Sequence, residues 1–201
     1  MFFGIAWIGG FTAWLPSTIS FLLVLITGSG LNEFYYFLIG NISIPLFLVI
    51  WLLAFTELKY IQYRKYIVGF YIIIGVIYEI FFIYYLLNDL SAIGEMTGYM
   101  DVTYIGVVRY YLIFTVLTML TTGILFCLES FKSENPEIRL KGKFLLVSFI
   151  TWAIGAIMDA ALPLNAVTLL IARSILILST FSFYLGFNLP KFVKNLFLSE
   201  K

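Results

Sequence analysis

Long, uninterrupted runs of apolar residues make up most of the chain, and short polar segments separate them. Because the runs do not alternate apolar with polar residues, they favour helices over the strands of a membrane barrel. Each run can supply the roughly 20 apolar residues that a helix needs to cross a bilayer. The pattern predicts an all-α transmembrane helical bundle with about six spans, at residues 2–27, 34–56, 66–87, 104–128, 144–162 and 166–187.

The polar connections between these runs are short, so we expect residues 1–201 to form a single transmembrane domain. Residues 188–201 follow the last span as a basic tail with an amphipathic pattern. Pro16 and Pro45 lie inside the first two spans, and each should kink its helix because proline lacks a backbone N–H. Asn41, four residues before Pro45, places a polar side chain beside the second kink.

The composition indicates a lipid environment and argues against metal and disulfide chemistry. With 62% hydrophobic residues and a mean hydropathy of +1.03, the chain is too apolar for a water-soluble domain, so the lipid bilayer is its expected partner. The net charge of +1 gives no indication of nucleic-acid binding. Histidine is absent and Cys127 is the single cysteine, so we expect no metal site and no internal disulfide.

The charges outside the spans divide sharply between the two faces of the membrane. The connections after the second, fourth and sixth spans carry Lys59, Arg64, Lys65, Lys132, Arg139, Lys141, Lys143, Lys191, Lys194 and Lys201. The opposite connections contain no lysine or arginine, and their acidic residues are Glu33, Asp89, Glu95 and Asp101. Because basic connections stay in the cytoplasm, both termini should be cytoplasmic in a multi-pass cell-membrane protein. A longer form with one more N-terminal helix would have its N terminus outside.

Four ionisable residues lie well inside the predicted spans: Glu79, Arg109, Asp159 and Arg173. A charge that faces lipid costs roughly 2 to 3 kcal/mol, so each should face the bundle interior and find a partner. The expected pairs are Glu79 with Arg109 and Asp159 with Arg173. Glu79 with Arg173, at equal depth, is the alternative.

The same residues suggest a repeated helical hairpin. GVIYE ends at Glu79 and GAIMD ends at Asp159, with the same spacing from glycine to acid, and VRYYLI and ARSILI carry the arginines of the returning helices. The third and fourth spans would then be a parallel copy of the fifth and sixth. The first two spans would be a divergent copy that lacks the charges.

Two interpretations of the four charges remain open. They are either salt bridges that specify the fold, or, together with Asn41, the lining of an outward-open pocket that binds a small ligand or ion. Polar residues at helical spacing on the charged helices favour a pocket, although such stripes are also typical of helix packing. The stripes consist of Tyr111, Thr115, Thr118 and Thr122, and of Ser148, Thr151, Gly155 and Asp159.

Three segments carry a resemblance to known proteins. NPEIRLKGKFLL at 135–146, IGAIMDAALPL at 154–164 and FYLGFNLP at 183–190 resemble a group of uncharacterised archaeal multi-pass membrane proteins. More distantly, the basic loop and the acid-bearing helix after it are similar to the seven-helix membrane sensor regions of histidine kinases. This chain departs from those regions by its six spans and its lack of a kinase domain. The second resemblance implies a receptor-like role.

We therefore expect a receptor-like sensor that binds a small molecule in an outer-half polar pocket and signals through a cytoplasmic protein. A small-solute or ion transporter is the alternative, and a structural or assembly role is the third. The spans contain no lysine for a retinal Schiff base, and no nucleophile or phosphate-binding motif occurs. No enzyme activity, no catalytic residue and no cofactor are therefore expected.

Overall fold

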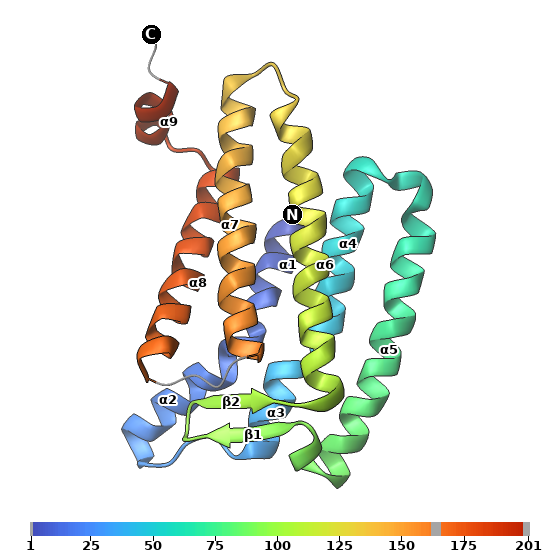
Figure 1. The fold of residues 1–201 in the computed structure, drawn as a ribbon, viewed down its shortest axis with the longest axis vertical. Coiled ribbons are helices and arrows are strands. Elements are labelled where there is room, and N and C mark those ends of the chain that lie inside the picture. The colour runs from blue at the N-terminus through green and yellow to red at the C-terminus, as the bar shows by residue number, and fades with distance from the viewer. Residues whose placement is uncertain (1, 162–165, 199–201) are drawn as a thin grey trace. The chain divides into compact units, whose positions relative to one another are not determined.

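The computed structural model describes residues 2–161 and 166–198, and these residues are almost entirely helical (Figure 1). Among them, six helical segments are long and apolar enough to cross a membrane: Phe3–Thr27, Glu33–Lys59, Ile61–Asn88, Gly106–Phe131, Pro136–Asp159 and Val167–Phe187. Each segment overlaps one predicted span, so the all-α fold with six spans is confirmed. The predicted end of the fifth span at Leu162 lies outside the described residues.

Backbone contacts divide the chain into two compact units, Met1–Leu112 and Ile113–Lys201. The division falls inside helix α6 (Gly106–Phe131), whose first turns belong to the first unit. The single domain expected over residues 1–201 stays a prediction.

The first span of the first unit is broken where the sequence predicts a kink. Helix α1 (Phe2–Gly10) leads into a short 3₁₀ turn, η1 (Phe11–Trp14), and then into α2 (Leu15–Thr27). Pro16 cannot donate to the carbonyl of Thr12, and the N–H of Leu15 binds that carbonyl instead. The hydrogen bond here spans three residues instead of the four of an α-helix, so the helix is interrupted and the predicted kink is confirmed.

The second span is broken in the same way. Helix α3 (Glu33–Asn41) ends at a two-residue turn, and α4 (Ile44–Lys59) begins just before Pro45. The hydroxyls of Thr12 and Ser43 lie 2.8 Å apart, so a hydrogen bond joins the two breaks. The second predicted kink is therefore also confirmed, and the two kinks stabilise each other.

A β-hairpin follows the third span, and the sequence pattern did not predict it. After η2 (Ile61–Tyr63), α5 (Arg64–Asn88) and η3 (Leu90–Ala92), strand β1 (Gly94–Thr97) pairs antiparallel with β2 (Asp101–Tyr104). The hydroxyl of Ser20 on α2 donates to the carbonyl of Tyr99, and the hydroxyl of Tyr36 on α3 donates to that of Met100 over 2.9 Å. The turn of the hairpin is thus fixed to the helices of its own unit.

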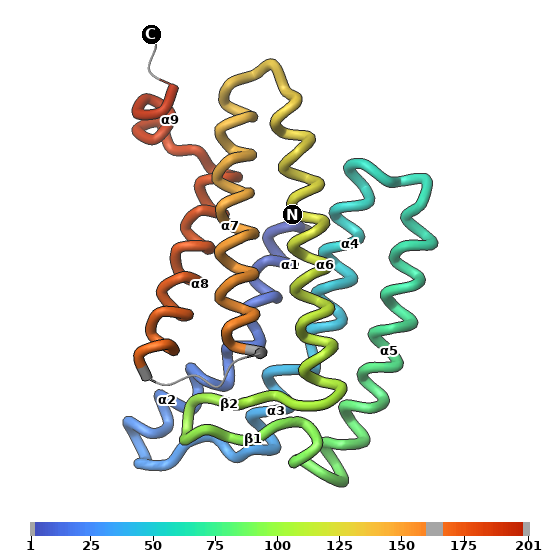
Figure 2. The backbone as a smooth tube through the Cα atoms, in the orientation of Figure 1, coloured from blue at the N-terminus to red at the C-terminus, as the bar shows by residue number. Residues whose placement is uncertain are grey.

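The second unit contains the rest of α6, followed by α7 (Pro136–Ala161), α8 (Ala166–Phe187) and α9 (Lys191–Leu198). Helices α7 and α8 run side by side in opposite directions, as the backbone trace shows (Figure 2). Small residues allow this close approach: a Cβ on Gly186 would collide with Cγ of Leu145, and one on Gly155 would lie 2.8 Å from Cγ of Leu176. Larger side chains at either glycine would force the two helices apart.

Candidate functional site

The structure brings Asp159 and Arg173 together. Nη1 of Arg173 on α8 lies 2.7 Å from Oδ2 of Asp159 on α7, and the side chains are 27% and 14% exposed, respectively. Gly155, one turn before Asp159, faces Leu176 on α8, so the close helix contact sets the distance across which the charges meet. The geometry is that of an ion pair joining two helices. A role of this pair in ligand binding stays a prediction.

The hydroxyl groups of the polar stripe on α7 donate hydrogen bonds to backbone carbonyls of α7 and α8. The hydroxyl of Ser148 donates to the carbonyl of Ser179 on α8 over 2.8 Å, and that of Thr151 donates to its own helix at Val147 over 2.7 Å. On α6, the hydroxyl of Thr122 likewise donates to the carbonyl of Thr118. These hydroxyls are satisfied by backbone carbonyls, as is common in membrane helices. Helix packing therefore explains Ser148, Thr151 and Thr122, whereas the buried hydroxyl of Thr115 on α6 has no hydrogen-bond partner among the described residues.

Glu79 on α5 differs from the other charges. Both of its carboxylate oxygens are buried, and neither has a hydrogen-bond partner among the described residues. The pairing predicted for Glu79 and Arg109 is therefore not formed. Glu79 lies nine residues from the end of α5, or about 13 Å along its axis, whereas Arg109 lies three residues from the start of α6, or about 5 Å. The two charges thus lie at different depths, so the carboxylate and the guanidinium do not meet.

The two acids of the proposed repeat also differ in their packing. Gly75, one turn before Glu79, approaches Pro45 of α4: a Cβ there would lie 3.1 Å from that of Pro45. Gly155, one turn before Asp159, approaches the returning helix α8 instead. The duplication of the hairpin therefore stays a prediction, while both glycines are explained as points of close helix contact.

Asn41 is the centre of a buried polar cluster in the first unit. Its side chain is fully buried, and its Nδ2 donates to the carbonyl of Phe37 over 2.9 Å and to the hydroxyl of Tyr104 over 3.3 Å. The hydroxyl of Tyr78 donates to Oδ1 of Asn41 over 3.4 Å. Asn41 thus links α3, α5 and β2 through one amide group.

A stacked pair of tyrosines completes this cluster. The rings of Tyr78 and Tyr111 lie 3.8 Å apart between centroids and are nearly parallel, at 11°. A Cβ on Gly75 would lie 3.8 Å from the hydroxyl oxygen of Tyr111, so the face of α5 that carries Gly75 and Glu79 points toward this pair. We call Asn41, Tyr78, Tyr104 and Tyr111 the tyrosine cluster; all four side chains are buried.

Asn41 and Glu79 were predicted as site residues from the sequence, but the tyrosines were not predicted as a group. Tyr78 directly precedes Glu79, and Tyr111 follows Arg109 by two residues, so their positions were visible as neighbours of charges. Tyr104 was predicted to begin the fourth span, but it lies in strand β2 of the hairpin. Of the predicted site residues, Asp159 and Arg173 thus form an ion pair with each other, whereas Glu79 lies on the helix face that points toward the tyrosine cluster.

Six apolar helical segments of membrane length identify this chain as a multi-pass integral membrane protein. No protein-family model, curated protein or solved structure matches it. The resemblance to archaeal membrane proteins and to kinase sensor regions stays a prediction.

Proposed function

We propose that this membrane protein is a receptor-like sensor that binds a small, positively charged ligand at Glu79. The observation that carries the proposal is the state of this carboxylate: both oxygens are buried, and neither has a hydrogen-bond partner within the described part of the chain. An ionised carboxylate in that position is costly unless a proton or a cation neutralises it. A site of this kind is suited to a cation that arrives from outside the fold.

The neighbouring groups favour an organic ammonium ion over a metal ion. Calcium and magnesium prefer several oxygen ligands, whereas this site offers one carboxylate. Tyrosine rings attract ammonium groups through a free π face, and Tyr78 and Tyr111, which stack on each other through one face each, lie toward the side of α5 that carries Gly75. The proposed ligand is therefore a small molecule with an ammonium or quaternary ammonium group.

The hydrogen bonds of the cluster suggest how binding would be passed on. Tyr78, next to Glu79 in the chain, is hydrogen-bonded to Asn41. Asn41 is in turn hydrogen-bonded to Tyr104 at the end of the hairpin. Asn41 also ends α3 directly before the break in the second span. A ligand that moves Tyr78 would therefore act on a helix break, which is a natural point for a change of helix direction.

The proposal keeps the predicted topology, with both termini and the basic connections in the cytoplasm. The cluster then lies in the outer half of the membrane, and the connection between α6 and α7 lies in the cytoplasm with α9. Because these cytoplasmic segments are short, the signal would pass to a separate cytoplasmic protein. The transporter alternative has less support, since Ser148 and Thr151, which it would need for a polar path, are bonded to backbone carbonyls.

Thermal unfolding of the purified protein in nanodiscs tests the proposal. Choline, ethanolamine and tetramethylammonium are added at constant ionic strength to the parent, to Glu79→Gln and to the control Glu95→Gln, which removes an exposed charge from the hairpin. A ligand at one hundred times its Kd adds about 2.7 kcal/mol of stability, so we expect at least one cation to raise the Tm by several degrees. The rise should occur in the parent and the control and disappear in Glu79→Gln.

Three outcomes would overturn this function. If no cation raises the Tm of the parent, or if Glu79→Gln responds as strongly as the parent, Glu79 is not the binding group. If the same cation is taken up into proteoliposomes in a manner that requires Glu79, the protein is a transporter. Glu79→Gln should itself fold at least as stably as the parent, because it removes a buried charge with no hydrogen-bond partner among the described residues.

A further inference from the structure

The C-terminal helix α9 folds back onto the start of α7. Nζ of Lys194 lies 2.6 Å from Oε2 of Glu137, and Nζ of Lys141 lies 3.4 Å from Oε1 of the same carboxylate. The rings of Phe144 and Phe197 meet edge to face at 5.8 Å. An ionic contact and an aromatic contact therefore hold α9 in a defined position against its own unit.

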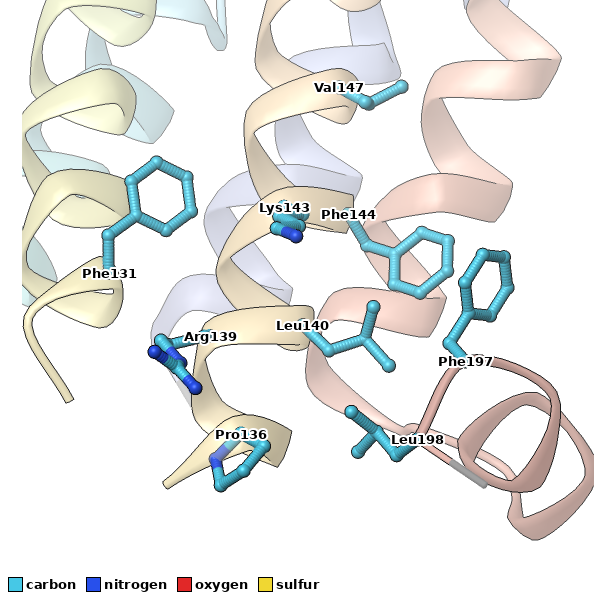
Figure 3. Close-up of a pocket in the computed structure, with 9 residues that line it drawn as sticks. All are labelled: Phe131, Pro136, Arg139, Leu140, Lys143, Phe144, Val147, Phe197 and Leu198. Atoms are coloured by element: carbon cyan, nitrogen blue, oxygen red, sulfur yellow. The ribbon is translucent and has the colours of Figure 1, made fainter. Parts of the chain in front are cut away.

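A pocket of about 660 Å³ lies between α9, α7 and the end of α6 (Figure 3). Its walls are mostly apolar: Phe131 comes from α6, Phe144 and Val147 from α7, and Phe197 from α9. Figure 3 shows Arg139 and Lys143 on the face of α7 between Phe131 and Phe197. The pocket thus combines an apolar wall with two cationic groups.

The two cations are available to a ligand. Arg139 and Lys143 are four residues apart on one helix face and both are exposed, and neither forms an ion pair with another described residue. The neighbouring Lys141 and Lys194 are instead paired with Glu137. The carboxylate of this region is therefore already occupied, and the pocket presents a net positive charge.

The pocket lies where a membrane span ends and the polar connection begins. Lys143 is the last charged residue before the apolar stretch of α7 that begins at Phe144, so the pocket lies at the end of a membrane span. On α9, Phe192 is 70% and Leu196 is 74% exposed, which is typical of a helix that lies in the membrane interface with its apolar face in lipid. In a membrane these two apolar side chains can face lipid instead of water.

We propose that this pocket binds one anionic phospholipid, with its phosphate held by Arg139 and Lys143 and its acyl chains along the phenylalanine and valine walls. The charge of the pocket complements the phosphate, and a guanidinium binds phosphate oxygens through two parallel N–H groups. Each basic residue near an anionic membrane surface adds about 1 kcal/mol of attraction, so two of them favour an anionic over a neutral lipid by at least about tenfold. The site is independent of Glu79.

Native mass spectrometry of the full chain tests this site. The protein is delipidated and offered equimolar phosphatidylglycerol and phosphatidylcholine, and the retained lipid is counted for the parent, for Arg139→Gln/Lys143→Gln and for the control Arg64→Gln/Lys65→Gln. The control removes the same charge from another basic connection. We expect the parent and the control to retain phosphatidylglycerol with at least about tenfold preference, and the Arg139/Lys143 variant to lose that preference.

Three results would overturn the proposal. Equal retention in the parent and the Arg139/Lys143 variant, or equal loss in both double variants, would mean that general surface charge attracts the lipid. Displacement of the lipid by millimolar inorganic phosphate would identify a site for the free anion. Because Arg139 and Lys143 are exposed, the double variant should keep the Tm of the parent in neutral lipid, which separates a lost site from a lost fold.

Discussion

Arg173 donates a hydrogen bond from Nη1 to Oδ2 of Asp159 over 2.7 Å, and this contact joins α8 to α7. The two residues are 14 positions apart in the sequence and lie about one turn from a close contact between the two helices, at Gly155 and Leu176. The ion pair and the contact of Gly155 with Leu176 therefore hold the two antiparallel helices together at the same place.

Asp159→Asn and Arg173→Gln should each destabilise the protein, because each leaves the opposite charge in a largely apolar setting. Since both side chains are part-exposed, we expect about 1 to 2 kcal/mol for each single variant, less than for a fully buried pair. The double variant should recover part of this loss, and thermal unfolding of all four proteins in detergent measures the coupling. Lys132→Gln, which removes an exposed pair, is the control. Unchanged stability in both single variants would mean that the fold does not need this pair.

Asn41→Ala should destabilise the first unit more than an ordinary surface change. The substitution removes the acceptor of the Tyr78 hydroxyl and the donor to the Tyr104 hydroxyl in a fully buried position. We expect a loss of about 1 to 3 kcal/mol in the free energy of unfolding. Asn88→Ala is the matched control, because its amide also donates to the carbonyl four residues earlier but is exposed. Similar Tm values for the two variants would contradict the central role of Asn41.

The spans and their kinks could be predicted because they depend on local chemistry. A continuous apolar run has few solutions in lipid other than a helix, and Pro16 and Pro45 break their helices through the loss of one N–H each. The pairing of Asp159 with Arg173 also follows from local information, since the residues lie on neighbouring helices joined by a short connection. These features need no knowledge of distant segments.

The surroundings of Glu79 could not be predicted for the opposite reason. They depend on where α6 begins, and the hairpin sets that start at Gly106 by placing Tyr104 in β2. The strand sequences GEMT and DVTY are too short and too polar to stand out by their pattern, and their position depends on Tyr36 and Ser20, far away in the sequence. The unequal depths of Glu79 and Arg109, by contrast, follow from the sequence, because the predicted spans already place the two residues at different distances from their outer ends.

Gly155→Ala should destabilise the second unit, although alanine favours helices. The added methyl group would lie 2.8 Å from Cγ of Leu176 and 3.4 Å from the carbonyl oxygen of Ala172, so α7 and α8 must separate slightly. We expect a cost of about 1 to 3 kcal/mol from overpacking. Gly69→Ala on α5 is the control, since its Cβ would meet no atom within 4 Å and should be neutral or stabilising. Thermal unfolding of both variants measures the difference, and equal effects would mean that the helix contact can relax.

The proposed topology predicts which connections react with a membrane-impermeant maleimide. Cys127 is fully buried, so the parent chain should not react and serves as the control in intact cells. Glu95→Cys lies in the exposed hairpin and should react in intact cells, because the connections that contain only acidic residues are expected outside. Glu134→Cys lies in the exposed connection between α6 and α7 and should react only after the membrane is made permeable. The reverse pattern would place Arg139 and Lys143 outside the cell, and a signal through those connections could then not reach a cytoplasmic partner.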